Sequence, residues 1–348
     1  MTAESEYHSN FAEARKIAAG GLDRPSADAV GQHHLFDRLD WFESLHDAVF
    51  LNTKPLIAHA RLGDANLWLM LMTEGHTALS MAYWYSFAWR PVWTGNPDDA
   101  TKLALATHLL SGLRRRVSTV ALSPVPVEDN SASILQKAMR QAGWIVKSEA
   151  TSHNHWLETA SRAFADWWAE RPGALRSTVK RKGSKGLVAL EIHSNFDDKL
   201  WDEFEAVYRE SWKPPESHPD FLRHWARREG QAGTLRLAIA RIEGTAVAAQ
   251  FWSVDDGVAY IHKLSHISGR DALSPGTLLT HALFAKAFDE DKVTRIDFGT
   301  GDDGYKRDWM EHSAPLMTIT AWDPLQPTAW PAMVKTYASR LAARVRSR

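Results

Sequence analysis

The chain has 348 residues and a mass of 39.1 kDa, more than one domain usually holds, so two domains of roughly 150 residues each are expected. Its formal net charge is -1 and its pI about 7.0, which gives no overall positive field for nucleic acid or for an anionic membrane. There is no cysteine, which excludes thiol nucleophiles, disulfides and cysteine-ligated metals; the polar N-terminus and the lack of a long apolar run predict a soluble, cytoplasmic protein.

The first half begins with a turn-rich stretch, residues 1–30, which has no sustained periodicity and is interpreted as a loose lead-in. A first domain is expected over 31–158. Its pattern predicts a helix, three antiparallel strands, and then alternating helices and strands. The expected elements are a helix at Leu35–Val49, strands at Pro55–Leu62, Asn66–Thr73 and Ala78–Trp89, a helix at Asp98–Arg115, a strand at Val117–Leu122, a helix at Ser131–Ala142 and a strand from Trp144.

Sixteen tryptophans are unusual, and several lie in the run Met81–Trp93, M-A-Y-W-Y-S-F-A-W-R-P-V-W. Alternation in a strand would place Tyr83, Tyr85 and Phe87 on one face and Trp84 on the other. Two interpretations stay open. The run is either a strand buried on both faces or an aromatic surface for a long apolar group or a membrane interface.

The second half repeats this order, and a second domain is expected over 159–325. The expected elements are helices at Arg162–Glu170, Lys199–Trp212 and Pro219–Glu229, strands at Leu235–Ile242, Ala246–Val254 and Val258–His266, a helix at Pro275–Asp289, a strand at Arg295–Phe298, a short helix at Tyr305–Glu311 and a strand at Leu316–Trp322. A meander that feeds a strand–helix–strand unit predicts an α/β fold whose mixed sheet has helices on both faces, and not a doubly wound sheet.

The C-terminal segment 326–348 is predicted to be a basic amphipathic helix. Its apolar positions, Tyr337, Leu341 and Val345, lie opposite several arginines, Arg340, Arg344, Arg346 and Arg348. This pattern suggests peripheral contact with the inner face of a membrane.

Two motifs in the second half sharpen the interpretation. They are A-L-S-P-G-T-L-L at Ala272–Leu279 and I-D-F-G-T-G-D-D-G-Y-K-R-D-W at Ile296–Trp309. Together with the order of elements they resemble the GNAT superfamily of N-acyltransferases, in its CelD-like branch, which is similar to the Fem-type transferases with two tandem GNAT domains. L-R-S-T-V-K-R-K at Leu175–Lys182 resembles the same branch. The motifs cover about residues 160–325, whereas 31–158 matches by element order alone.

The resemblance implies that acyl-CoA binds where the loop 268–276 meets a helix N-terminus, because free backbone N–H groups and the helix dipole attract the pyrophosphate. Ser274 is the expected N-cap, Pro275 the first helical residue, and Gly276 lets the backbone approach the ligand. Arg270 and Thr277 complete the expected donor site. The usual glycine-rich signature of the superfamily is absent, so acyl carrier protein and aminoacyl-tRNA remain alternative donors. A capped helix without a ligand is the structural alternative.

Thioester aminolysis requires a base for the amine and an acid for the leaving thiol. The resemblance points to the end of the strand at Arg295–Phe298, where Tyr305 resembles the usual general acid. The candidate catalytic residues are His262, His266, Asp297, Asp302, Tyr305 and Lys306. Both histidines flank Leu264 and are expected to share a strand face, so either is a candidate base. Asp297 has an alternative role, which is to pair with Lys306 or Arg307, and strand histidines are often structural.

A basic run near Lys180 and Arg181, with Arg176, Lys182 and Lys185 beside them, suits the CoA 3′-phosphate, a tRNA backbone, an anionic headgroup or simply solvent. The run G-T-G-D-D-G at Gly299–Gly304 satisfies a dinucleotide-binding pattern, but too little chain follows to build that domain. The histidines show no metal-ligand spacing, so no metal is expected.

These observations predict an N-acyltransferase that moves an acyl group from a thioester, acyl-CoA above all, to a small-molecule or lipid amine. Aromatic richness and the basic tail favour a long-chain or sphingoid amine. The Fem-type resemblance favours cell-envelope or polysaccharide work, with an aminoacyl donor as one form. A third alternative is a non-catalytic binding protein. The first half lacks both motifs and is expected to shape the acceptor cleft.

Overall fold

The computed structural model describes residues 2–19, 21–22, 34–160 and 162–336, and it divides the chain into two compact units. Of the described residues, unit 1 contains 2–19, 21–22, 36–153 and 314–336. Unit 2 contains 34–35, 154–160 and 162–313. Each unit is a mixed sheet with helices, so the predicted α/β class is confirmed. The predicted domain boundary at 158/159 differs from the division at 153/154, because strand β7 (Ile145–Glu158) begins in unit 1 and ends in unit 2.

The sheet of unit 1 has the strand order β1-β2-β3-β4-β6-β13-β7. Its strands are β1 (Glu4–His8), β2 (Lys54–Leu62), β3 (Ala65–Glu74), β4 (Thr77–Ser80), β6 (Thr119–Pro126), β13 (His312–Trp322) and β7, with β5 (Val92–Thr94) attached to β3. Strands β2, β3 and β4 form the predicted antiparallel meander, and β4 and β6 are parallel. The meander of the first half is therefore confirmed, although its third strand is short.

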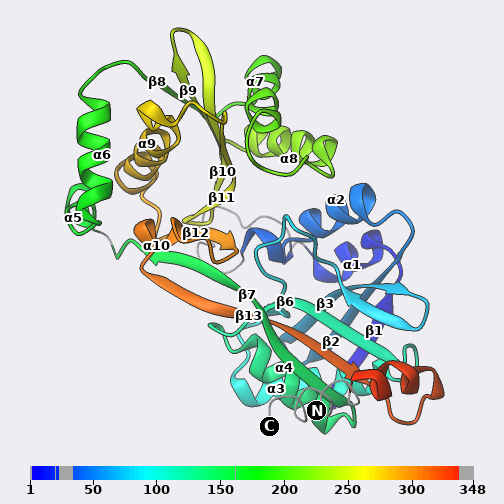
Figure 1. The fold of residues 1–348 in the computed structure, drawn as a ribbon. Helices are drawn as coiled ribbons and strands as arrows, with labels where there is room; N and C mark the ends of the chain where they lie inside the picture. The colour runs from blue at the N-terminus through cyan, green and yellow to red at the C-terminus, as the bar shows by residue number, and fades with distance from the viewer. Residues whose placement is uncertain (1, 20, 23–33, 161, 337–348) are drawn as a thin grey trace, which may run out of the picture. The chain divides into compact units, whose positions relative to one another are not determined.

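The helices of unit 1 are α1 (Phe11–Ala18), α2 (Leu39–Val49), α3 (Asp99–Leu113) and α4 (Ser131–Gln141), with a 3-10 turn η1 (Leu35–Asp37) before α2. In Figure 1, α3 and α4 cover one face of this sheet, and α1 and α2 cover the other. The predicted helix at Leu35–Val49 is divided at Arg38, whose backbone is extended and whose guanidinium bonds Asp40 at 3.0 Å. The lead-in is not loose throughout, because β1 pairs with β2 and α1 follows it.

The aromatic run after β4 is not a strand. Ser80 ends β4, the amide of Ser86 bonds the carbonyl of Tyr83 in a turn, and the indole of Trp89 donates to the carbonyl of Met70 at 2.8 Å. The predicted strand at Ala78–Trp89 is therefore wrong beyond residue 80. The alternation of faces fails with it, since a turn has no period of two; Tyr85 is buried while the neighbouring Trp84 is 73% exposed.

The sheet of unit 2 runs from the end of β7 through β12, β11, β10 and β9 to β8. Its strands are β8 (Ala189–His193), β9 (Leu235–Ile242), β10 (Thr245–Asp255), β11 (Val258–His266) and β12 (Arg295–Thr300). β9, β10 and β11 form the second predicted meander, and β11 and β12 are parallel. The edge strand β8 was not predicted. The predicted final strand of this half, Leu316–Trp322, pairs instead with β6 in the sheet of unit 1.

The helices of unit 2 lie on both faces of its sheet. They are α5 (Phe164–Ala169), α6 (Gly173–Gly183), α7 (Asp198–Arg209), α8 (Pro219–Gln231), α9 (Pro275–Asp289) and α10 (Lys306–Trp309). Figure 1 shows α5, α6 and α9 on one side of strands β9 to β11, and α7 and α8 on the other. The basic run 175–182 is helical in α6, which the sequence reasoning did not predict.

The core under α9 explains why this helix is fixed on the sheet. Its buried residues include Leu279, Leu283 and Phe284, and Trp167 of α5 stacks on Phe284 at 5.1 Å. Trp252 of β10 meets the same ring at 5.5 Å, edge to face. Burying each such side chain contributes about 1.5–3 kcal/mol, so the start of α9 is held firmly beside the strands.

No helix within the described ranges is long and apolar enough to span a bilayer. Residues 330–336 are helical, and Trp330 and Val334 are exposed. The rest of the predicted C-terminal helix, 337–348, lies outside the described residues.

Asp323, directly after β13, bonds Arg114 at the end of α3 in unit 1. Replacing Asp323 tests how much this bond stabilises the pairing of β13 with the unit 1 sheet. The carboxylate is buried and accepts bonds from Arg114 Nη2 at 2.5 Å and from the Leu325 amide at 3.0 Å. Burial alone would raise the pKa of Asp323, but these bonds outweigh it and hold the pKa below its usual range. We expect Asp323→Asn to lower the free energy of unfolding by about 2–3 kcal/mol.

Urea unfolding followed by tryptophan fluorescence measures this loss, and the exposed Glu74→Gln serves as the control for removing one charge. Because the folded pKa is depressed, the advantage of the native protein over Asp323→Asn is present above about pH 4 and shrinks as the pH falls further. An advantage that is independent of pH would contradict the ion-pair explanation.

Candidate functional site

A β-bulge in β11 decides which side chains face which helices. Phe251 of β10 pairs with Lys263, whereas the next residue, Trp252, pairs with Ile261, so His262 is the extra residue. His262 therefore stacks on Phe251 at 4.7 Å, on the α7 side, and bonds Ser253 Oγ at 2.9 Å.

Beyond the bulge the alternation is shifted by one residue. Lys263 turns to α7, where its ammonium lies 5.5 Å from the ring centre of Tyr208, and Leu264 packs against the core under α9. His266 lies on the α9 side, next to Gly276. A Cβ atom added to Gly276 would lie 3.5 Å from His266 Nδ1. The prediction that the two histidines share a face is therefore wrong, because an inserted residue reverses the period-two pattern.

A buried chain of hydrogen bonds fixes the N-terminus of α9 to β10. Gln250 accepts from the indole of Trp252 at 2.9 Å and donates to Thr280 Oγ1 at 2.7 Å and to the carbonyl of Gly276 at 3.3 Å. Thr280 also donates to that carbonyl at 2.9 Å. The first turn of α9 is thus positioned by buried polar groups that are satisfied by one another.

A cavity of about 320 Å³ opens at this helix N-terminus. It is lined by the end of β11, the loop and first turn of α9, and aromatic side chains from three other segments. The lining residues are Trp212, Leu264, His266, Asp271, Ser274, Pro275, Gly276, Thr277, Thr280, Phe298, Tyr305 and Trp309. We call this the α9 cavity. Its lining combines apolar and aromatic side chains with a few polar groups, which is the usual form of a small-molecule site.

His266 and Asp271 form a polar pair in the lining of the α9 cavity. His266 Nε2 lies 2.7 Å from Asp271 Oδ1, and Trp212 packs on the imidazole with ring centres 4.4 Å apart. The carboxylate can hold a proton on Nε2, which leaves Nδ1, the nitrogen beside Gly276, as the acceptor. This is the arrangement of a general base with an orienting carboxylate.

Tyr305 lies in the same cavity and packs edge to face on Phe298, with ring centres 5.7 Å apart. Partial burial, and then the nearby Asp303, raise the pKa of its phenol above the ordinary value. Tyr305 therefore keeps its proton at neutral pH and can donate it. The sequence placed Tyr305 and His266 in one site, and the structure brings them to one cavity.

The other acidic and basic candidates hold the turn after β12. Lys306 is buried, and its Nζ donates to the carbonyls of Phe298, Gly299 and Thr300 at 3.2, 3.2 and 2.7 Å. Asp297, also buried, accepts from the Gly299 amide at 2.9 Å and from Asn154 Nδ2 at 3.1 Å. Neither side chain lines the α9 cavity, so both position the turn that carries Tyr305.

Asp302 lies on the exposed side of this turn. It bonds Arg307 Nη2 at 2.8 Å and His155 Nε2 at 3.2 Å, and these contacts lower its pKa. Burial, followed by the charge of Lys306, lowers the pKa of His155. His155 and Asn154 were not predicted as site residues, since the two strands that carry them and Asp297 meet only in the folded sheet.

The predicted donor-site residues are divided by the structure. Gly276 and Thr277 line the cavity, and Pro275 is the first residue of α9, as expected. Ser274 occupies the N-cap position, but its backbone is left-handed, with φ of 50°, and its side chain makes no capping bond. It bonds the carbonyl of Asp271 instead, at 3.5 Å.

The basic candidates lie at the edge of this region. Arg270 is exposed and is not among the lining residues, and Lys180 and Arg181 are exposed on α6. Lys182 is the member of the basic run that reaches the α9 loop, where its Nζ donates to the carbonyl of Ala272 at 2.5 Å. Trp212 and Trp309 also line the cavity, and no sequence signal marked them as site residues.

Comparison with known proteins agrees with this geometry. Residues 169–307 match the family model of the acetyltransferase (GNAT) domain, whereas no curated protein matches the sequence significantly. The structure is similar to FemX, with 10% identity, 91% of this chain and 96% of that chain covered and a TM-score of 0.62.

Two further solved structures are similar. One is the C-terminal domain of a candidate lysylphosphatidylglycerol synthetase from Agrobacterium fabrum, with 13% identity, 85% and 95% of the two chains covered and a TM-score of 0.51. The other is a conserved protein of unknown function from Bacteroides thetaiotaomicron, with 13% identity, 92% and 100% covered and a TM-score of 0.57. At such identities the likeness shows the fold alone. The family match confirms the GNAT resemblance over residues 169–307, and the whole chain has a fold similar to that of FemX.

The Gln250 chain predicts a measurable role in holding α9. Gln250→Leu keeps the size of the side chain but leaves the buried indole N–H of Trp252 without its acceptor, which should cost about 1–3 kcal/mol of unfolding free energy. Hydrogen exchange should quicken in the first turn of α9. Thr245→Val, at an exposed position of the same strand, is the control. Equal stability and exchange in the two variants would contradict the assigned role.

Proposed function

We propose that the protein, whose residues 169–307 match the family model of the acetyltransferase (GNAT) domain, transfers an acyl group from a coenzyme A thioester to an amine. The observation that carries the proposal is the α9 cavity. It joins a helix N-terminus, a histidine–carboxylate pair and a protonated tyrosine within one apolar pocket. These are the groups that aminolysis of a thioester requires.

The residues at the start of α9 fit the phosphate part of coenzyme A. Ser274 makes no side-chain capping bond to the first turn, and Gly276 brings backbone without a side chain to the cavity. Backbone N–H groups at such a turn attract phosphate through hydrogen bonds and the helix dipole. Lys182 lies beside the same loop and adds a positive charge. Lys180 and Arg181 remain candidates for the 3′-phosphate, at the exposed edge of α6.

The proposed reaction has two proton transfers, one from the attacking amine and one to the leaving thiolate. His266, oriented by Asp271, accepts the proton of the amine as its nitrogen attacks the thioester carbonyl. The C–N bond forms, the C–S bond breaks, and Tyr305 gives its proton to the leaving thiolate. Proton transfers of this kind contribute about 10²–10⁴-fold to a rate. Lys306, Asp297 and Asp302 act through the turn that holds Tyr305, as positioning residues.

His262 is the less suitable base. It is held on the other face of the sheet by the bulge, and burial, with the charge of Lys263 nearby, lowers its pKa to about 3. A group that stays neutral across the working range of pH, away from the α9 cavity, suits a structural role. His266 is therefore assigned as the base.

The aromatic lining of the α9 cavity supports a long acyl chain or a lipid amine as the finer assignment. Trp212, Phe298 and Trp309 give it apolar walls, which favour an apolar group over acetyl by roughly 0.8 kcal/mol for each buried methylene. A Fem-type aminoacyl donor is the alternative, and the fold likeness to FemX supports it at the level of fold only.

Ligand-induced stabilisation distinguishes these donors. We expect acetyl-CoA and palmitoyl-CoA to raise the thermal midpoint of the purified protein, palmitoyl-CoA by more, because a ligand that binds only the native state stabilises it. Free CoA gives the contribution of the nucleotide part. A midpoint unchanged by all three ligands would contradict acyl-CoA as the donor and would favour an acyl carrier protein, an aminoacyl donor or a non-catalytic role.

Catalytic variants test the roles within the cavity. His266→Gln and Tyr305→Phe should each lower kcat by about 10²–10⁴-fold, while the midpoint shift with CoA is retained. His193→Gln is the matched control, because His193 also pairs with a carboxylate, Glu191, but on the edge strand β8. A rate in His266→Gln equal to that of His193→Gln would rule out His266 as the base.

A further inference from the structure

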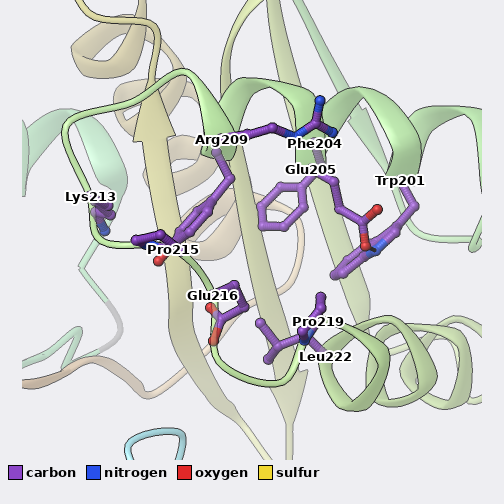
Figure 2. A pocket seen from close by; sticks show the side chains of 10 residues that line it. Trp201, Phe204, Glu205, Arg209, Lys213, Pro215, Glu216, Pro219 and Leu222 are labelled. Carbon is purple, nitrogen blue, oxygen red and sulfur yellow. Dashed lines mark hydrogen bonds between the residues drawn. The ribbon is translucent and has the colours of Figure 1, made fainter.

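A second cavity lies on the other face of the unit 2 sheet, between α7, α8 and the loop that joins them. Its volume is about 330 Å³. Figure 2 shows Trp201 and Phe204 of α7 and Leu222 of α8 around it, with Lys213, Pro215 and Glu216 of the connecting loop on the remaining side. We call this the α7 cavity. None of the residues assigned to acyl transfer lines it.

The acidic side chains of the α7 cavity already have partners. Glu205 accepts from the indole of Trp201 at 2.7 Å and lies 3.6 Å from Arg223. Glu216 pairs with Lys263 at 2.5 Å. Tyr208 keeps its proton, since burial and the charge of Glu216 raise its pKa to about 12. The cavity therefore offers a hydroxyl donor and no carboxylate without a cationic or N–H partner.

Two cationic side chains also line the cavity, Arg209, which is exposed, and Lys213, which is half-buried. Within the described part of the chain, the Lys213 ammonium has neither an ion pair nor a hydrogen bond, and it lies 5.8 Å from the ring centre of Trp212. Burial, and then the positive charges of Lys263 and Lys306, lower its pKa to about 8, against the weaker opposite effect of Asp303 and Glu216. Lys213 is thus mainly charged at neutral pH, in surroundings that do not neutralise it.

A half-buried cation without a counter-ion is costly, and an anion that enters the cavity would remove this cost. The walls restrict the anion further. Trp201, Phe204 and Leu222 are apolar and buried, so they favour a ligand with an aromatic or branched apolar body over a hydrated inorganic ion.

We propose that the α7 cavity is a binding site for a small carboxylate with an apolar body, whose carboxylate is held by Lys213 and the hydroxyl of Tyr208. The apolar body lies against Trp201 and Phe204. This inference concerns binding alone and does not depend on acyl transfer, so it stands or falls separately from the proposed function.

Calorimetric titration of the full-length protein with 3-phenylpropanoate tests the site, and 3-phenylpropanamide and 3-phenylpropylamine serve as probes of the same shape without the negative charge. We expect the acid to bind at least roughly tenfold more tightly than either, because a hydrogen bond to a charged group is lost in both. Equal binding of the three, or no binding of the acid, overturns the proposal. The proposal is also overturned if inorganic phosphate binds as tightly as the acid and competes with it, because the site would then be a general anion site.

Variants locate the interaction. Lys213→Met should weaken binding of the acid by roughly tenfold or more, and Lys213→Gln provides a second, polar replacement. Lys199→Met, at an exposed position of α7, is the matched control. The unfolding midpoint of each variant establishes that it is folded. Unchanged affinity in folded Lys213→Met or Lys213→Gln overturns the assignment, whereas loss in both with retention in Lys199→Met supports it.

Discussion

The bulge at His262 is the local constraint on which both cavities of unit 2 depend. An extra residue in β11 reverses the facing of every side chain after it. Leu264 and His266 consequently face α9, and Lys263 faces α7, where it pairs with Glu216. Without the bulge His266 would lie on the face of α7, away from Gly276. One inserted residue thus places a titratable group on each side of the sheet.

The shape of the α9 cavity also depends on buried side chains that hydrogen-bond backbone carbonyls around it. Gln250 holds the first turn of α9, and Lys306 gathers the last carbonyls of β12. Both are buried polar side chains whose bonds are directed at backbone, so the two loops that carry Gly276 and Tyr305 have fixed positions. The groups that line the α9 cavity come from separate segments, and these hydrogen bonds hold the segments in place.

The α7 cavity shows the opposite balance. Its carboxylates have partners. The pKa of Lys213, in contrast, is lowered by burial and by the positive charges of Lys263 and Lys306. Stable proteins usually pair a buried charge, which is the reason for the proposal that a ligand supplies the counter-charge of Lys213. The two cavities of unit 2 differ in chemistry, with a histidine–carboxylate pair and Tyr305 at α9 and a lysine beside Tyr208 at α7.

The sequence by itself determined the fold class, both meanders, and the helix that begins at Pro275, because periodicity and turn residues are local signals. The motifs that follow the meander also predicted Gly276, Thr277 and Tyr305 as site residues, and the pattern of β11 predicted His266; the structure places all four beside the α9 cavity. The sequence could not reveal the bulge, because the apolar and polar residues of β11 are compatible with a regular strand as well as with a strand that has one extra residue.

Only the tertiary structure decided which strands meet. Residues 316–322 pair with β6 in the sheet of unit 1, and His155 reaches Asp302 because β7 lies beside β12. Such partners are far apart in the chain, and their choice depends on long-range sheet pairing that no local pattern encodes. The same holds for Lys213, whose cationic neighbours come from β11 and α10 and are brought together only by folding.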